Sequence, residues 1–495
     1  MAFRARLGHK ALNILPFLIT FIHVLLSPYT KVEESFSLHV AHDILAFGLS
    51  PSHFHLWDHM TFPGAVPRSF LPPILLALLT YPLSATAVFL GFVRTKVDVQ
   101  LLVILSISFI LRSTSKSAPR NFSKRRIRKA VILLTATATV IRLELALFIL
   151  PTVLSLLISG RLTVFQAIAN GAVGGLGSLL ISAPIDYTLW YPSLSHPSFP
   201  FHDPVQLLWP ESSALHYNLV QGQADSWGVS PWWYYLLNSL PKICLSSLPL
   251  ALVGTGWAVL ARRKQIDVVR GSRSVDGIRE VLQLFGPGIM TIVGGMSCVG
   301  HKEWRFIAYV VPIINLVAAF TASSLWPNPG KLLGPMLRLG LVGLVLANLF
   351  VTGVSTFLSV HNYPGGEVWK VLDDLLRDSN DTGATLFTFL HSSSTPSGHY
   401  PALPPPMEPS WIYSKAEDSD LNFSSPDGAW RGGVDYVITE DWGLYERWEV
   451  KGDQGQRKGW DTVGGVEGLE RVRRKGRRGL EVQWAKKVGV LKRKG

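Results

Sequence analysis

The sequence predicts an all-α protein that crosses a membrane several times. Of its 495 residues, 48% are hydrophobic and only 16% are charged, whereas a soluble domain usually carries about 25% charged residues. The mean hydropathy is +0.26. A spanning helix needs about 20 mostly apolar residues, and such runs occur at residues 11–28, 70–93, 163–184, 243–261, 281–300, 306–325 and 339–360.

Two further apolar runs are irregular. Residues 130–159 form a long run that contains Arg142 and Glu144, and residues 99–111 form a short one. Charge inside such a run is costly, so it indicates either the outer turn between two short helices or a deeply buried functional site. The first run of the chain follows basic residues and has no small-residue cleavage site after it, so we expect an uncleaved first helix.

The positive charge of the chain has a defined location. Its 47 Lys and Arg residues exceed its 34 Asp and Glu residues, which gives a net charge of +13, as in many nucleic-acid-binding proteins. Here, residues 112–129 carry eight basic residues and no acid, and residues 261–280 carry six against three acids. Both loops lie between apolar runs. They are therefore predicted to be cytoplasmic, next to membrane lipids and without a nucleic-acid partner.

This orientation places four segments on the opposite, outer side of the membrane: residues 29–69, residues 185–230, the turn at 301–305 and the chain from residue 361. Glycosylation sequons at Asn380 and Asn422 agree with it. The sequon at Asn121 lies in a basic loop and should be unused. Cys244 and Cys298 are too few for a disulfide framework or a Cys-rich metal site.

Composition divides the chain into three regions. Residues 1–360 hold the apolar runs. Residues 361–470 are polar and rich in Gly and Pro, and they contain strand-like pieces such as Val434–Thr439, which predicts a small extramembrane α/β region. Residues 471–495 are strongly basic and are predicted to form a disordered tail.

Polar residues crowd the first outer loop. Glu33 and Glu34 stand side by side just past the first apolar run. Adjacent carboxylates repel each other, and partial burial should raise the pKa of at least one of them. Such a group suits general-base chemistry on a hydroxyl. The alternative is a solvated helix end with its acids beside Lys31.

Histidines follow in the same loop. His39 and His42 are three residues apart and would share a helix face, with Asp43 beside them. A metal site is one interpretation, but no HExxH or comparable spacing supports it. We favour hydrogen bonding to sugar hydroxyls or phosphate, and expect no metal.

The turn His301–Phe306 places His301, Lys302 and Arg305 within five residues on the outer side. This local exception to the positive-inside rule favours binding of an anionic lipid phosphate. The alternative is a charged turn that anchors two helices at the membrane surface. The aromatic stretch Trp227–Tyr235 predicts an interfacial belt, or else a platform for lipid or sugar.

Other classes of membrane protein have less support. No GxxxxGK[ST] loop for nucleotide phosphates occurs. A carrier more often places charges at mid-membrane between repeated halves, and no repeat is obvious. A transporter or an inactive membrane scaffold remains the alternative to an enzyme.

Several motifs together resemble one known family, the dolichyl-phosphate-mannose-dependent mannosyltransferases of glycosyltransferase family 22. Within it, the chain is most similar to the endoplasmic reticulum α-1,6-mannosyltransferases that extend dolichol-linked oligosaccharide. The resemblance covers about residues 10–370. The matching motifs are His301–Phe306 (His-Lys-Glu-Trp-Arg-Phe), Lys31–Phe36, Trp57–Arg68, Trp209–Glu211, Trp227–Pro231 and His361–Gly366.

The resemblance implies a GT-C fold, with the region from residue 361 in the lumen. The implied reaction is inverting transfer of mannose from dolichyl phosphate mannose to a 6-hydroxyl of the lipid-linked glycan in the endoplasmic reticulum lumen, for N-glycan precursor assembly. No cofactor and no metal are implied. Alternatives within the family are α-1,2 transfer to the same glycan and transfer to a GPI precursor.

The resemblance also implies roles for single residues. Glu33, or else Glu34, is the implied base that deprotonates the attacking hydroxyl. The residues expected at the donor phosphate are His301, Lys302, Arg305 and Arg142. Those expected to position the acceptor or a sugar are Asp58, His59, Arg68, Trp209 and Glu211.

One segment departs from the family pattern. The two runs at 70–93 and 99–111 would return the chain to the outer side, which conflicts with the basic loop at 112–129. Relatives carry more sequence after Val97–Leu102, including an Arg-Thr-Leu-Pro-Asn segment that has no counterpart here. We therefore hypothesise that a segment near residue 103 is missing, as a skipped exon in a gene model would produce.

Overall fold

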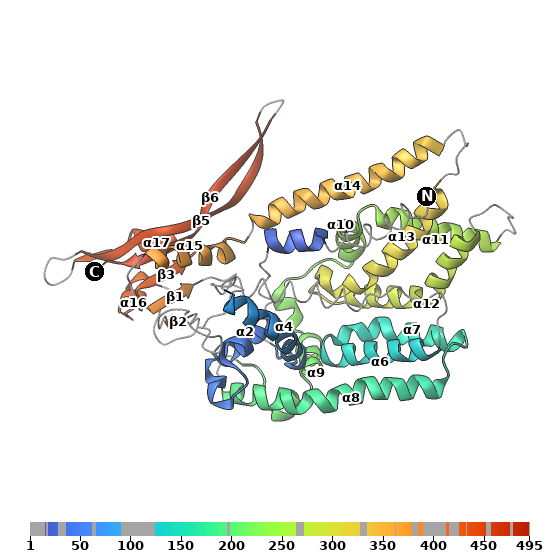
Figure 1. Cartoon of the computed structure of the whole chain (residues 1–495), viewed down its shortest axis with the longest axis horizontal. Helices are drawn as coiled ribbons and strands as arrows, with labels where there is room; N and C mark the ends of the chain where they lie inside the picture. The colour runs from blue at the N-terminus through green and yellow to red at the C-terminus, as the bar shows by residue number, and fades with distance from the viewer. Residues whose placement is uncertain are drawn as a thin grey trace. The chain divides into compact units, whose positions relative to one another are not determined.

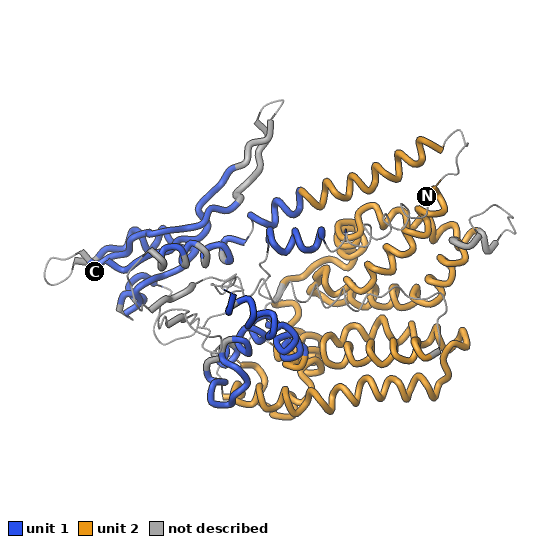
Figure 2. The backbone as a smooth tube through the Cα atoms, in the orientation of Figure 1, with its two compact units in different colours: residues 1–63, 72–117, 354–495 blue, residues 64–71, 118–353 orange. Residues whose placement is uncertain are grey.

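A computed structural model describes a large part of the chain. The chain forms two compact units (Figure 2), of which unit 1 comprises residues 1–63, 72–117 and 354–495 and unit 2 comprises residues 64–71 and 118–353. The described residues are 15, 18–27, 36–61, 66–90, 124–195, 199–263, 272–326, 334–361, 363–378, 385–389, 412–414, 425–431, 433–451, 457–475 and 479–494.

Unit 2 is built from long helices. Figure 1 shows α6, α7 and α8 side by side, and α11 and α12 both pack against α13. The helix bounds are α6 (Lys124–Val140), α7 (Ala146–Ile158), α8 (Val164–Trp190), α9 (Pro210–Leu215), α10 (Leu240–Cys244), α11 (Ser247–Arg263), α12 (Ser272–Ser297) and α13 (Val311–Leu325). Helix α14 (Gly334–Val360) begins in unit 2 and ends in unit 1.

Small residues let these helices approach closely, as is common where helices pack in membranes. A Cβ atom at Gly174 of α8 would collide with the carbonyl oxygen of Ile132 in α6. A Cβ atom at Gly288 of α12 would lie 2.7 Å from the carbonyl oxygen of Phe148 in α7. Glycine therefore sets the spacing between α6 and α8 and between α7 and α12.

Among the described residues, three helices are long and apolar enough to cross a membrane: Val164–Ser195, Trp304–Leu325 and Gly334–Val360. They confirm that the predicted runs at 163–184, 306–325 and 339–360 form apolar helices of spanning length. Large apolar side chains cover their outer surfaces, for example Leu180 at 77% exposure and Phe350 at 72%. Such surfaces suit a polytopic protein whose helices face lipid.

The remaining predicted runs differ in detail. The run at 243–261 is bent: the helices Tyr235–Cys244 and Ser247–Leu260 meet at 109°, at Leu245, whose φ of 45° interrupts the helix. The other outcomes are α4 (Leu71–Phe89) for 70–93, the second half of α12 for 281–300, and helical residues 18–26 for 11–28. The run at 99–111 lies outside the described residues.

The long run at 130–159 is two helices, as one interpretation of its charges predicted. Helix α6 ends at Val140, and α7 begins at Ala146 after a 3₁₀ turn at Leu143–Leu145 (η3). Arg142 and Glu144 lie in this break. The costly charges are therefore placed at a helix boundary rather than within a helix.

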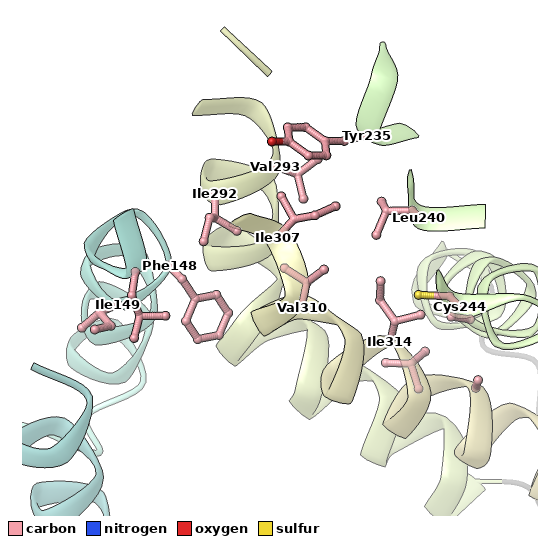
Figure 3. Packing of buried hydrophobic residues seen from close by; sticks show 14 of the residues in the cluster. Phe148, Ile149, Tyr235, Leu240, Cys244, Ile292, Val293, Ile307, Val310 and Ile314 are labelled. Atoms are coloured by element: carbon pink, nitrogen blue, oxygen red, sulfur yellow. The ribbon is translucent and has the colours of Figure 1, made fainter. Parts of the chain in front are cut away.

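An apolar core joins α7, α12 and the segment that follows the turn at 301–305. Figure 3 shows Phe148 of α7 and Ile292 of α12 near Ile307 and Val310 of a 3₁₀ helix at Trp304–Val310 (η9). All four side chains are buried. The core therefore fixes the base of the turn.

Unit 1 contains a mixed β-sheet of six strands in the order β2-β1-β3-β6-β5-β4. Strands β1, β2 and β3 are parallel, and the other pairs are antiparallel. The predicted strand within Val434–Thr439 is confirmed as β3. The bounds are β1 (Thr385–Phe389), β2 (Ile412–Ser414), β3 (Tyr436–Thr439), β4 (Glu449–Lys451), β5 (Arg457–Lys475) and β6 (Gly479–Arg493).

Helices cover both faces of this sheet. Helix α15 (Pro364–Asp378) packs Val368 and Leu372 against Val488 and Val490 of β6. On the other face, α16 (Pro426–Arg431) and α17 (Trp442–Glu446) enclose a cluster of Ala429, Val434, Val437, Tyr445, Trp460 and Leu491.

The prediction of a disordered tail at residues 471–495 was wrong for the described part. Arg471–Lys475 belongs to β5, and Gly479–Arg493 forms β6, which pairs with both β3 and β5. The reason is the apolar segment Val488–Leu491, which fills the cores on both faces of the sheet. The basic residues around this apolar segment led to a prediction of disorder where the chain forms a central strand.

The N-terminal part of unit 1 is also helical. Residues 18–26 form a helix, and the hydroxyl of Ser27 lies 3.1 Å from that of Ser359 near the end of α14. Further along the chain are α2 (Phe36–Phe47), a 3₁₀ helix at Pro51–Leu56 (η2) and α3 (Asp58–Thr61). Asn121, Asn380 and Asn422, the three predicted sequons, lie outside the described residues.

Candidate functional site

The helices of unit 2 place the candidate site residues at one end. Successive helices of the unit run in opposite directions, so that the break after α6, the end of α8 and the end of α12 lie at the same end in Figure 1. The α7–α8 loop at residues 159–163 lies at the opposite end. Two charged groups at the first end concern the predicted function.

The first group is an arginine–glutamate cluster formed by Arg68, Arg142, Glu144 and Glu211. An Nη1 atom of Arg68 donates a hydrogen bond of 2.8 Å to Oε1 of Glu211. The backbone N–H of Leu143 donates to Oε2 of Glu211 at 3.4 Å, and Arg142 lies 3.7 Å from Glu144. Glu211 therefore links the segment before α4 to the break between α6 and α7.

Local structure positions each member of this cluster. Helix α6 stops at the break because the N–H groups of Ile141 and Arg142 both bind the carbonyl of Thr137. The indole N–H of Trp209 donates to the carbonyl of Thr139 at 2.8 Å. Trp209 precedes α9, so this bond places Glu211, in the first turn of α9, beside the break.

Burial and charge are balanced in the cluster. The side chain of Glu211 is only 3% exposed, whereas that of Arg68 is 29% exposed. Burial raises the pKa of Glu211, and the positive charges of Arg68 and Arg142 act in the opposite direction. Two cations face two carboxylates, so the cluster can orient polar groups without presenting a large excess of charge.

The second group is the His301 turn, residues 298–306, between α12 and α13. Oε1 of Glu303 accepts a 2.6 Å hydrogen bond from Nη2 of Arg305 and lies 2.9 Å from Nε2 of His301. Glu303 therefore holds together His301 and Arg305, two of the four predicted phosphate ligands. The turn ends in η9, whose buried Ile307 and Val310 anchor it to the core (Figure 3).

Lys302 has different surroundings. Its side chain is buried, and its ammonium group donates hydrogen bonds to the carbonyls of Ser230 (2.8 Å), Gly300 (3.4 Å) and Val299. A lysine has three N–H donors, and here three carbonyls accept from it. Lys302 thus connects the end of α12 to the loop at residues 228–231.

The same loop makes two further contacts with the turn. The N–H of Ser230 donates to the carbonyl of Gly300 at 3.0 Å, and Nδ1 of His301 lies 3.2 Å from the carbonyl of Gly228. Gly228 has a φ of +96°, a backbone conformation that residues other than glycine rarely adopt. Part of the predicted aromatic belt, Trp227–Tyr235, is therefore attached to the His301 turn.

The remaining site predictions fall in unit 1 or outside the described residues. His59 is buried, with its ring 5.7 Å from that of Trp57. His42 and Asp43 are also buried, 3.2 Å apart. Glu33 and Glu34, the predicted bases, and the side chain of Asp58 lie outside what the structure describes.

The structure thus shows which of the predicted residues lie together. It brings Arg142, expected at the donor phosphate, together with Arg68 and Glu211, expected at the acceptor. It adds Glu144 and Glu303, which the site prediction lacked although both stand within two residues of a predicted cation. Across the described ranges, no group of three or more His, Cys, Asp or Glu side chains is arranged to hold a metal ion.

Comparison with known proteins places the chain in a family. The model of the Alg9-like mannosyltransferase family matches residues 99–397. A Schizosaccharomyces pombe relative, named a probable Dol-P-Man:Man(7)GlcNAc(2)-PP-Dol alpha-1,6-mannosyltransferase, is 26% identical over 84% of this chain and 74% of its own length. The Drosophila melanogaster protein of that name is 25% identical over 84% of this chain and 61% of its own length.

A shorter match involves a different named activity. GPI mannosyltransferase 3 of Gibberella zeae is 34% identical, but over only 24% of this chain and 18% of its own length. No solved structure matches. Since the family model covers more than half of the residues, the chain belongs to the Alg9-like mannosyltransferase family.

Proposed function

We propose that this protein is an inverting α-1,6-mannosyltransferase. It moves mannose from dolichyl phosphate mannose to a dolichol-linked high-mannose oligosaccharide, for N-glycan precursor assembly. One observation carries the proposal: relatives from two yeasts, an insect and a plant, all with this activity in their names, match 73–84% of the chain at 23–27% identity.

The proposed setting is the membrane of the endoplasmic reticulum, with a GT-C fold and the active site in the lumen. The apolar helices of unit 2 support a multi-pass protein. Both charged groups lie at the end of unit 2 that is opposite the α7–α8 loop. This supports a single active site on one side of the membrane. The sheet of unit 1, from residue 361, is proposed to lie in the lumen as well.

The proposed reaction needs a base and a site for the leaving group. The 6-hydroxyl of the acceptor attacks C1 of mannose, the bond from C1 to the phosphate oxygen breaks, and dolichyl phosphate leaves. Glu33, with Glu34 as the second candidate, accepts the hydroxyl proton. Cations stabilise the negative charge that develops on the phosphate.

The geometry of the His301 turn supports different roles for its cations. Arg305 and His301 are held by Glu303, remain partly exposed, and are proposed to contact the phosphate, with Arg142 as a further ligand. Direct contact of Lys302 with phosphate stays a prediction. Its three carbonyl bonds support a role in holding the turn in place.

The arginine–glutamate cluster is proposed to serve the acceptor. Arg68 is partly exposed and fixed by Glu211, which suits hydrogen bonding to sugar hydroxyls. Trp209 supports this role indirectly, because its indole bond places Glu211. Asp58 and His59 are proposed as further acceptor residues on the basis of the family resemblance. We propose that the reaction uses no metal and no cofactor.

The test is mannosyl transfer by the purified full-length chain. Dolichyl phosphate mannose is supplied with a lipid-linked glycan of seven mannoses, and the product is analysed by mass spectrometry and linkage-specific mannosidases. We expect one added mannose that only an α-1,6-mannosidase releases. An acceptor that already carries this mannose is the control and should not react. Addition of an α-1,2-linked mannose would overturn the proposed linkage.

The second candidate is transfer to a GPI precursor. Matches to GPI mannosyltransferase 3 proteins favour it, but these cover only 24–37% of the chain. A GPI precursor is therefore included as a competing acceptor. Transfer to this acceptor alone would replace the main proposal, and transfer to neither would favour a transporter or a scaffold.

Glu33 gives the most direct test of the proposed base. Glu33→Gln keeps the size of the side chain but removes its ability to accept a proton. We expect a rate at least about a hundredfold lower with unchanged protein yield, whereas Glu34→Gln should retain most of the activity. The reverse order would assign the base to Glu34, and full activity of both variants would exclude the pair.

The hypothesis of a missing segment near residue 103 bears on this test. The match with the Schizosaccharomyces pombe relative extends over 453 aligned residues but uses only 84% of this 495-residue chain, about 416 residues. The alignment therefore includes positions at which this chain has no residue. Transcript sequencing tests the hypothesis, because an uninterrupted message that encodes residues 97–111 would reject it. If a longer message is found, its product is the chain to assay.

A further inference from the structure

Two residues at the end of α8 hold the segment that carries Arg68. Oδ1 of Asp186 accepts hydrogen bonds from the backbone N–H of Phe70 (2.7 Å) and the hydroxyl of Ser69 (3.2 Å). The indole N–H of Trp190 donates to the carbonyl of Arg68 at 2.8 Å. Asp186 and Trp190 are four residues apart and so lie on one helix face. Three consecutive residues, Arg68 to Phe70, are therefore bound by one face of α8.

Asp186 also completes the start of another helix. The hydroxyl oxygen of Ser69 accepts from the N–H of Leu71, the first residue of α4, at 3.3 Å. The first N–H groups of a helix have no partner within it, and a carboxylate near them is favourable. Asp186, which is completely buried, supplies that acceptor from a different helix, both directly at Phe70 and through Ser69.

Aromatic packing prevents the indole of Trp190 from turning away. Trp190 is fully buried, its ring stacks on that of Phe199 with centroids 5.4 Å apart, and Phe70 lies against it at 5.1 Å. The bond from the indole to the Arg68 carbonyl is thus made by a buried ring that packs against two other aromatic rings. The backbone at Arg68 is held on both sides.

This geometry matters because the guanidinium of Arg68 must reach Glu211. Arg68 lies 143 residues before Glu211 in the chain, and no regular element contains it. We propose that Asp186 and Trp190 are positioning residues for Arg68: by fixing the backbone from Arg68 to Phe70, they direct its guanidinium to Glu211. The effect on mannosyl transfer rests on the proposed function, whereas the effect on the backbone does not.

The backbone effect is tested by hydrogen exchange in the purified full-length chain. Asp186→Ala should speed exchange of the Phe70 amide by about tenfold or more, because this amide loses its buried acceptor. Exchange of the Leu71 amide should rise as well, because its acceptor, the Ser69 hydroxyl, loses the bond to Asp186 that holds it in place. Asp186→Asn should restore slow exchange, since its amide oxygen still accepts both bonds. Unchanged exchange in Asp186→Ala would overturn the proposal.

Two further variants keep this test decisive. Thr188→Ala is the matched control, because Thr188 lies on the exposed side of the same helix and bonds only to its own backbone at Pro184; its exchange at residues 66–71 should equal that of the unaltered chain. If Asp186→Ala does not fold, Ser69→Ala replaces it. This variant should speed exchange at Leu71 but leave Phe70 protected, and no change at Leu71 would overturn the proposal.

The effect on activity is tested by a double-mutant cycle with Arg68→Gln. If Asp186 acts through Arg68, Asp186→Ala should lower the rate of mannosyl transfer by about tenfold in the unaltered chain but have little further effect beside Arg68→Gln. An equal loss in both backgrounds would overturn a role through Arg68. If the unaltered chain transfers no mannose, the proposed function fails, and the exchange result still decides whether Asp186 fixes the backbone.

Discussion

The two charged groups of unit 2 are built in opposite ways. The arginine–glutamate cluster draws its four side chains from three distant segments of the chain, and each of its arginines forms an ion pair with a carboxylate. The His301 turn takes its charges from five consecutive residues, and backbone carbonyls satisfy its buried lysine. The first group depends on complete ion pairs, whereas the second depends on the path of the backbone. They should therefore respond differently to substitution.

The largest expected effect is on the cluster. Glu211→Gln leaves Arg68 without its buried carboxylate partner, and breaking a buried ion pair costs about 3 kcal/mol or more. The midpoint of thermal unfolding in detergent should fall clearly. The control is Glu280→Gln, because Glu280 forms an ion pair of 2.6 Å with Arg161 at an exposed site and should contribute less than about 1 kcal/mol. Equal shifts would show that burial of Glu211 does not matter.

The next effect concerns the buried lysine of the turn. Lys302→Met keeps the length of the side chain but removes all three carbonyl bonds, and a hydrogen bond to a charged group contributes about 1.5–3 kcal/mol. We expect a loss of stability of about 2 kcal/mol and a lower kcat for mannosyl transfer. Lys242→Met, at an exposed lysine of α10, is the control. A higher KM for the donor with unchanged stability would indicate direct phosphate binding instead.

A smaller effect is expected from the loop that Lys302 binds. Gly228→Ala forces a side chain into a φ of +96°, which costs about 1 kcal/mol or more. The carbonyl of Gly228 should then move away from His301, so the KM for dolichyl phosphate mannose should rise. Gly256→Ala, in a helix with nothing within 4 Å of the added Cβ atom, should leave the KM unchanged. The same KM in both variants would separate the loop from the turn.

The smallest expected effect applies to both groups. Because the proposed reaction relies on side-chain cations, removal of divalent metal ions should leave the rate of transfer unchanged. The measurement is the initial rate after dialysis against EDTA, with and without added Mg²⁺ or Mn²⁺. A rate that falls on dialysis and recovers with one of these ions would require a metal-dependent mechanism.

The sequence predicted local features of the site well. A break at Arg142 and Glu144 was one of the two interpretations of charges inside an apolar run, and the His301 turn followed from its position between two such runs. Sequence alone did not reveal that Lys302 faces carbonyls or that Glu303 binds both His301 and Arg305, because the direction of a side chain depends on its neighbours in space. The role of Asp186 was missed for the same reason.

The C-terminal region gives a similar lesson. The charge of residues 471–495 predicted disorder, yet Val488–Leu491 is buried between helices on both faces of the sheet. A short apolar segment among many charges has no strong signal of its own. Its partners in α15, in β3 and beside α17 lie far away in the sequence, and only their packing makes it a central strand.

The sequence by itself determined that this protein has apolar helices suited to a membrane and charged residues at the breaks between them. These features depend on hydropathy and charge within a segment of about one helix length, which the sequence shows directly. Tertiary structure decided which charges meet. Arg68 and Glu211 are 143 residues apart. They come to 2.8 Å only because α8 holds the segment at Arg68 while the end of α6 holds the start of α9. A buried charge is stable only beside an opposite charge or hydrogen-bonding partner. Which residue is that partner depends on the packing of distant segments, so no single segment of the sequence determines it.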